Sequence, residues 1–195
     1  MARRYVFLLA SGRRDGNTES LARRAAAALP GDDAQTWIRL ADHPLPPFRD
    51  LRHGTERYTE PTGNEKILAD ATVAATDLVM AAPLYWYGLP ASAKLYLDYW
   101  SAWMRVSSLD FKKRMAGKTL WAICALSDDD RSTADPYVGI LRLSAGYLGM
   151  RWGGVLFGLG SRPGDVLQDA RALAEAEQFF AAGERPAIGT DSPPE

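Results

Sequence analysis

Short, continuous apolar segments recur along this chain and alternate with helix-like ones. Residues 5–10 read Tyr-Val-Phe-Leu-Leu-Ala, and comparable runs lie at 77–82, 118–126 and 155–159, with a less apolar strand-like run at 35–40. A strand that is apolar at consecutive positions, rather than at alternate ones, is typical of a parallel sheet buried on both faces. Helical segments are predicted between these runs, at 19–29, 64–75, 90–106, 136–148 and 165–182. The alternation predicts an α/β three-layer sandwich.

Length and composition exclude several classes of protein. A chain of 195 residues suits one large domain. Its 23 basic and 24 acidic residues give a net charge of -1, which offers no whole-molecule signal for nucleic acid. The single Cys excludes a disulfide framework within the chain, and no apolar run approaches the roughly 20 residues of a membrane helix. We therefore expect a cytoplasmic protein without membrane or nucleic-acid partners.

The loop between the first strand and the first helix has the composition of a phosphate site. Ser11 and Thr18 offer hydroxyl groups, Asn17 offers an amide, and Arg13 adds positive charge. Gly16 lets the backbone turn its N–H groups inward, and the helix that follows directly favours an anion at its first turn. Neither the P-loop nor the dinucleotide fingerprint is present. An ordinary polar turn that caps a helix remains the alternative interpretation.

Three consecutive aromatic residues follow the third predicted strand. Tyr85, Trp86 and Tyr87 come where parallel strands of such a fold present their ligand edge. Three neighbouring side chains cannot all point into one core. We therefore expect at least one to face a cleft or a subunit interface, where a flat conjugated ligand would fit.

Together these two loops resemble a known family. Residues 10–18, Ala-Ser-Gly-Arg-Arg-Asp-Gly-Asn-Thr, and the later Pro83-Leu-Tyr85 with Pro90-Ala-Ser-Ala-Lys94 resemble, in order, two motifs of the flavodoxin-like NADPH-dependent FMN reductases. That family includes NAD(P)H:quinone and FMN oxidoreductases. The resemblance spans roughly residues 4 to 183. Ala10 stands where the family has Gly, and the lone Cys124 excludes the iron–sulfur branch.

The resemblance implies a fold and a set of cofactor-binding residues. The expected fold is flavodoxin-like, with a five-stranded parallel sheet of order 2-1-3-4-5 in a domain covering residues 1–184. The tail at 185–195 is expected to be disordered. The family's FMN-binding positions correspond here to Ser11, Arg13, Gly16, Asn17 and Thr18 around the phosphate, and to Pro83, Leu84, Tyr85, Trp86, Tyr87, Gly88, Ser127 and Asp128 around the ring. No side chain is expected to be catalytic, because the flavin carries the chemistry.

The implied function is an FMN-dependent oxidoreductase. Electrons would pass from NADPH or NADH through FMN to a small acceptor such as a quinone or free flavin, in a homodimer or higher homo-oligomer. The alternatives are a non-enzymatic electron carrier or flavin-binding module, and a protein that has kept the fold and lost the flavin. Carriers usually present an acidic docking face, so the near-neutral charge favours the reductase.

Several other features have simpler interpretations. The three Asp residues at 128–130 are read as an exposed acidic turn, with a Mg²⁺ site as the alternative and no metal expected. The Gly-rich segment 158–164 follows a strand and precedes a helix, as a nucleotide loop does, but its spacing differs from G-x-G-x-x-G. It is read as a turn, with a phosphate site as the alternative. Cys124 is expected to be an inert buried thiol. Trp100 and Trp103 share a helix face and belong either to the core or to a dimer contact.

The Pro-rich segment 42–61 is long for a connection and is read as a functional or interface loop. It contains His43 and His53, both expected to be solvated, with a role as general acid as the alternative.

Overall fold

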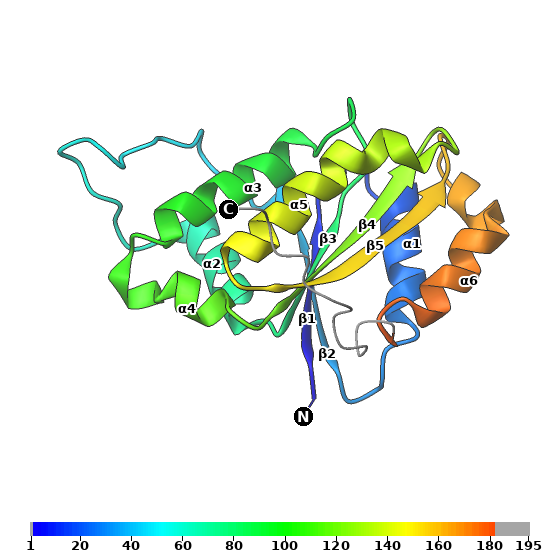
Figure 1. Ribbon diagram of the computed structural model, residues 1–195, viewed down its shortest axis with the longest axis horizontal. Coiled ribbons are helices and arrows are strands. Elements are labelled where there is room, and N and C mark those ends of the chain that lie inside the picture. Colours follow the sequence, from blue (N-terminus) through cyan, green and yellow to red (C-terminus); the bar gives the residue numbers. More distant parts are fainter. Residues whose placement is uncertain (1, 182–195) are drawn as a thin grey trace, which may run out of the picture.

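The computed structural model describes residues 2–181 and has a central sheet of five parallel strands (Figure 1). The strands are β1 (Arg4–Leu9), β2 (Ala34–Arg39), β3 (Asp77–Ala81), β4 (Thr119–Leu126) and β5 (Arg151–Leu159). Their order, β2-β1-β3-β4-β5, confirms the predicted topology. The order reverses between β1 and β3, so the ligand edge of the sheet lies beyond the carboxyl ends of these two strands.

Six α-helices of the described chain surround the sheet and cover its two faces. They are α1 (Asn17–Ala26), α2 (Gly63–Ala74), α3 (Ala91–Trp103), α4 (Phe111–Met115), α5 (Asp135–Tyr147) and α6 (Ala170–Gln178). Short 3-10 helices occur at η1 (Leu40–Asp42), η2 (Ser107–Leu109), η3 (Arg131–Ala134) and η4 (Asp165–Gln168). Figure 1 shows α1 and α6 on one face and α2, α3 and α5 on the other. Among the described residues, no helix is both long and apolar enough to span a membrane.

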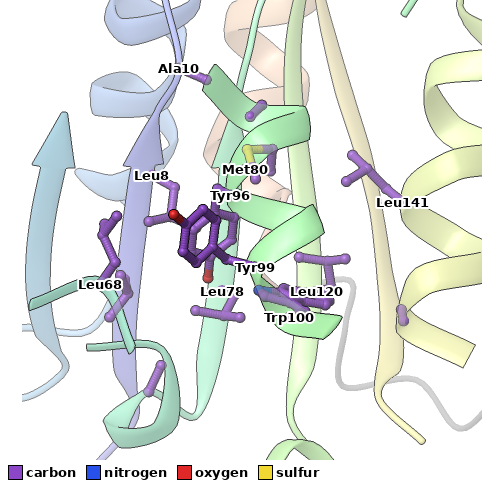
Figure 2. Packing of buried hydrophobic residues seen from close by; sticks show 14 of the residues in the cluster. Leu8, Ala10, Leu68, Leu78, Met80, Tyr96, Tyr99, Trp100, Leu120 and Leu141 are labelled. Carbon is purple, nitrogen blue, oxygen red and sulfur yellow. The ribbon is translucent and has the colours of Figure 1, made fainter. Parts of the chain in front are cut away.

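Each face of the sheet has its own core, which explains the continuous apolar strands. In β1, Leu8 packs toward α2 and α3, whereas Phe7 packs toward α1 and α6. Figure 2 shows Tyr96, Tyr99 and Trp100 of α3 over the strands of the first face. Trp100 and Trp103 are both buried there, so they belong to the core of this chain.

Two of the differences from the sequence-based element boundaries have a clear physical reason. The closing helix, expected at 165–182, is split because Asp169 caps α6 by accepting the N–H of Ala172 at 3.0 Å. The last strand contains the predicted core at 155–159 but already begins at Arg151. Its glycines resemble breakers, but a Cβ at Gly153 would lie 2.3 Å from the Trp121 ring, so the strand needs glycine there. Residues 182–184 of the expected domain and the tail at 185–195 lie outside the described part of the chain.

Candidate functional site

A cavity of about 290 Å³ lies at the carboxyl edge of the sheet, where loops after four strands meet. The loop between β1 and α1 supplies one wall, and the loops after β3 and β4 supply another. Its lining residues are Ser11, Arg13, Gly16, Asn17, Thr18, Pro83, Leu84, Tyr85, Ala125, Ser127, Gly160 and Ser161. Nine of the thirteen predicted cofactor-binding residues are therefore brought together around this one cavity.

The start of α1 directs unpaired N–H groups toward this region. Gly16 is the N-cap, and the helix begins at Asn17, ahead of the predicted segment 19–29. The first N–H groups of a helix have no partner within it, and they carry the positive end of the helix dipole. Ser11 is nearly buried beside them, and its hydroxyl oxygen accepts the N–H of Arg13 at 3.1 Å. This arrangement suits a phosphate group.

A buried carboxylate holds the same loop in place. Glu19, only 3% exposed, accepts hydrogen bonds from the guanidinium groups of Arg39 at 2.5 Å and Arg23 at 2.8 Å. It also accepts the N–H of Asp15, while Arg39 donates to the carbonyl of Arg13 at 3.3 Å. Burial opposes ionisation of Glu19, but the hydrogen bonds from the two arginines prevail and lower the pKa of its carboxyl. The charge is thus neutralised within the protein.

The side-chain amide of Asn17, which the sequence assigns to the phosphate, is hydrogen-bonded within the protein instead. Its amide nitrogen donates to the carbonyl of Arg162 at 2.8 Å, and its amide oxygen accepts the N–H of Gly164 at 2.9 Å and of Val166 at 3.4 Å. The side chain therefore joins α1 to the loop between β5 and η4. What Asn17 can offer to an anion is its main-chain N–H.

The aromatic residues after β3 form a tight two-residue hairpin. The loop is anchored to β4 by the hydrogen bond from the Leu84 N–H to the carbonyl of Ala125, and Gly88 closes the turn against Tyr85. Tyr85 is 51%, Trp86 94% and Tyr87 59% exposed, so none of the three enters the core. Tyr85 lines the first cavity.

A second cavity, of about 260 Å³, lies next to the first. Trp86 and Tyr87 line it together with Ser127 and Asp128. The remaining lining residues are Leu84, Leu126 and Thr133, and Leu84 and Ser127 line both cavities. The two cavities thus form adjoining polar and aromatic compartments. Twelve of the thirteen predicted residues line one or the other, and the exception is Gly88, which closes the turn against Tyr85.

The three carboxylates of the acidic turn after β4 all have partners within the protein. Asp128 accepts the N–H of Asp130, Asp130 accepts the N–H and hydroxyl of Ser132, and Asp129 pairs with Arg171 at 2.8 Å. No cluster of three or more His, Cys, Asp or Glu residues suited to a metal occurs within residues 2–181. The turn is an exposed acidic border of the site.

Sequence reasoning missed one wall of the first cavity. Gly160 and Ser161, which follow β5, line the cavity, whereas the sequence favoured a turn over a phosphate site for segment 158–164. A Cβ at Gly160 would lie 2.7 Å from the Asn17 amide nitrogen and 2.9 Å from the main-chain nitrogen of Val166. The predicted parallel sheet could have indicated this wall. In such a sheet the carboxyl ends of β1 and β5 lie at the same edge, so the segment after β5 reaches the ligand site.

The other chemically active side chains lie apart from both cavities. Cys124 is buried in β4, and burial raises the pKa of its thiol to about 12. His43 and His53 line neither cavity; both belong to the segment between η1 and α2, and His43 lies near Ser92 and Tyr96 of α3.

Comparisons with known proteins agree with this architecture. A family model described as flavodoxin-like fold matches residues 3–181. A Bacillus subtilis (strain 168) protein, named provisionally as the NAD(P)H-dependent FMN-containing oxidoreductase YwqN, is 31% identical over 169 residues, which cover 86% of this chain and 91% of that protein.

Solved structures are similar over most of their length. The Trp repressor binding protein from Bacillus subtilis superposes with a TM-score of 0.72 at 26% identity, covering 90% of this chain and 97% of the other. An FMN-dependent NADH-azoreductase from Bacillus anthracis, solved with FMN, gives a TM-score of 0.62 at 14% identity over 93% and 98% of the two chains, a likeness of fold. By its family match and its sheet order, this chain belongs to the flavodoxin-like fold family.

Proposed function

We propose that this protein is an FMN-dependent NAD(P)H oxidoreductase that reduces a small acceptor such as a quinone or a free flavin. The observation that carries the proposal is the pair of adjoining cavities, one rich in anion donors and one lined by aromatic side chains. The name of the YwqN relative and the FMN bound to the azoreductase support the same assignment.

The donor set of the first cavity fits a phosphate monoester. Arg13 supplies positive charge, Ser11 and Thr18 supply hydroxyl groups, and the first turn of α1 supplies main-chain N–H groups. Glu19 is the nearest acidic side chain in α1, and its pairing with Arg39 and Arg23 limits its repulsion of an anion. These residues would hold the FMN phosphate.

The aromatic compartment would hold the flavin ring and admit the reactants. Leu84, which is hydrogen-bonded to β4, and Tyr85, from the wall of the first cavity, would contact the ring, and Ser127 and Asp128 would border its other side. Trp86 and Tyr87 would offer flat, exposed surfaces on which a planar acceptor or a nicotinamide can stack. When bound, FMN would supply the hydride-accepting chemistry. The protein's task would be placement, which agrees with the position of both His residues outside the cavities.

Anaerobic titration of the purified protein tests this proposal. The protein is loaded with FMN, freed of excess flavin, and mixed with NADPH and with NADH while the flavin absorbance is followed. Rapid bleaching by either nicotinamide is expected. Bound flavin that neither nicotinamide reduces would identify a carrier, and failure to bind FMN at all would overturn both functions.

The acceptor is identified in a second step. The FMN-loaded protein is reduced with the better nicotinamide and then offered a quinone or free FMN, and the rate of reoxidation is compared with that in buffer alone. Acceleration by either compound supports a reductase of small molecules. Reoxidation at the buffer rate with both would contradict the proposed acceptor class.

A further inference from the structure

Besides the wall formed by the loops after β3 and β4, the first cavity has two walls that come from opposite ends of the chain. Ser11, Arg13 and Thr18 form one wall after β1, whereas Gly160 and Ser161 face them from the segment that follows β5. We name residues 160–164 the β5 loop. The anion donors Ser11, Arg13 and Thr18 all belong to the first wall. The β5 loop can therefore take part in ligand binding only if it presents a donor of its own.

The β5 loop is fixed at several points and cannot move freely from the cavity. At its start, the Gly160 N–H donates to the carbonyl of Leu126 at 2.8 Å. Further along, the Asn17 amide bonds to the main chain at Arg162 and Gly164. A group held by such contacts is preorganised, so little conformational entropy is lost when it meets a ligand.

The main-chain donors at the start of this loop are already used. Asp165 accepts the N–H of Ser161 at 3.0 Å and the N–H of Arg162 at 2.6 Å with the same carboxylate oxygen. Within residues 2–181, by contrast, the Ser161 hydroxyl makes no hydrogen bond, although Ser161 lines the cavity. The donor that the β5 loop can offer to the cavity is therefore this hydroxyl.

Binding of a phosphate in this cavity requires uncharged hydrogen-bond donors as well as Arg13. Among the lining residues that belong to the described part of the chain, Arg13 is the single charged side chain, whereas a phosphate monoester carries up to two negative charges near neutral pH. Hydroxyl and main-chain N–H donors must complete the coordination of its oxygens. Hydrogen bonds to a charged group are also stronger than those between neutral groups.

We propose that the Ser161 hydroxyl donates a hydrogen bond to the FMN phosphate from the second wall, with Asn17 as the positioning residue that holds this wall in place. The assignment rests on the proposed function, since it presumes FMN in the first cavity. It makes the phosphate site a two-loop site that closes only when β5 and η4 dock against the start of α1.

Comparison of FMN with riboflavin tests the assignment, because riboflavin lacks the phosphate. Dissociation constants for both are measured from flavin fluorescence for the wild type, Ser161→Ala, Ser161→Thr and the control Ser107→Ala. Ser107 is also exposed and its hydroxyl is likewise unbonded among the described residues, but it lies in η2, remote from the cavity. Thermal unfolding without ligand verifies that every variant folds.

Ser161→Ala is expected to weaken FMN binding about tenfold and to leave riboflavin binding unchanged. Ser161→Thr, which keeps a hydroxyl, should retain most of the FMN affinity, and Ser107→Ala should match the wild type. Equal losses for FMN and riboflavin, or no loss of FMN affinity in Ser161→Ala, would overturn the assignment while leaving the proposed function intact. Failure of the wild type to bind FMN would overturn the proposed function and this assignment with it.

Discussion

Tyr85 and Gly88 exchange two main-chain hydrogen bonds, of 3.1 and 3.0 Å, across a turn of only two residues. Those two residues, Trp86 and Tyr87, have φ angles of 49° and 63°, in the left-handed region. Turns of this geometry normally use Asn-Gly, because bulky side chains are strained there by about 1–3 kcal/mol each. Exposed aromatic side chains gain little packing in return. Strain of this kind is typical of binding sites.

Replacing Tyr87 with glycine should change stability and activity in opposite directions. Tyr87→Gly relieves the left-handed strain and is expected to raise the free energy of unfolding by about 1 kcal/mol. If Tyr87 supports a stacked reactant, kcat/KM for a quinone should fall severalfold in the same variant. Thermal unfolding and steady-state kinetics measure the two effects.

Asp110→Gly is the matched control for this experiment. Asp110 also has a positive φ, of 40°, but it is exposed and lies at the start of α4, away from both cavities. Its replacement should stabilise the protein slightly without altering kinetics. If the kinetics of Tyr87→Gly also remain at the wild-type level, the strained turn does not contact a reactant.

Neighbouring arginines should differ sharply in their importance for FMN. Arg13 lines the first cavity, whereas Arg14 pairs with Asp42 at 2.8 and 3.0 Å. Arg13→Ala is expected to weaken FMN binding roughly 10–100-fold, because a charge-assisted contact to phosphate is lost. Arg14→Ala should stay within about twofold of the wild type, since exposed ion pairs contribute little. Similar losses in the two variants would mean that only the overall charge of the loop matters.

The Glu19 carboxylate should make the protein sensitive to acid. Its pKa is lowered in the folded state, so its contribution to stability is present above the unfolded pKa, near the ordinary 4.5, and is lost as pH falls through the lower folded pKa. Glu19→Gln should therefore be less stable than the wild type at neutral pH, and the difference should shrink in that acidic range. Urea unfolding at a series of pH values measures it. A difference that does not change with pH would contradict the role of ionised Glu19.

Asn17→Asp should destabilise the contact between α1 and the β5 loop. The change removes the donor to the Arg162 carbonyl and leaves a carboxylate oxygen facing it, at a cost of about 1–3 kcal/mol. For a chain of this size, each kcal/mol lowers Tm by about 2–4 °C. Asn64→Asp is the control, because Asn64 makes a similar amide-to-carbonyl bond to Pro44 at 3.0 Å in an exposed place. Equal shifts in Tm would argue against a special role for Asn17.

The thiol of Cys124 should be unreactive in the native protein. Its pKa of about 12 leaves almost no thiolate near pH 8, and the side chain is fully buried. Ellman's reagent should detect no thiol until denaturant is added, and then one per chain. Rapid labelling of the folded protein would show that β4 opens locally.

Much of the fold was predictable from the sequence because its strands are apolar throughout. The runs at β1, β3 and β4 indicate burial on both faces, and the family resemblance added the strand order that the structure confirms. The beginning of β5 was missed because Gly153 looks like a breaker when read alone. Its purpose becomes visible only when Trp121 of the neighbouring strand lies against it.

The candidate site was predictable where it is local in sequence and not where it depends on packing. The loop before α1 and the aromatic residues after β3 were assigned from short motifs, and the structure brings them to one edge. The side-chain bonds of Asn17 and the exposure of Ser161 to the cavity depend on the docking of β5, which no short motif encodes.

The Asn17 contact has a consequence for how the protein is made. Its partner, the Arg162 carbonyl, lies 145 residues further along the chain. During synthesis the first wall of the cavity can emerge from the ribosome early, but the second wall cannot join it until β5 and η4 have also emerged. If FMN needs both walls, a nascent chain holds the flavin only weakly, and cofactor capture becomes one of the last steps in the maturation of the protein.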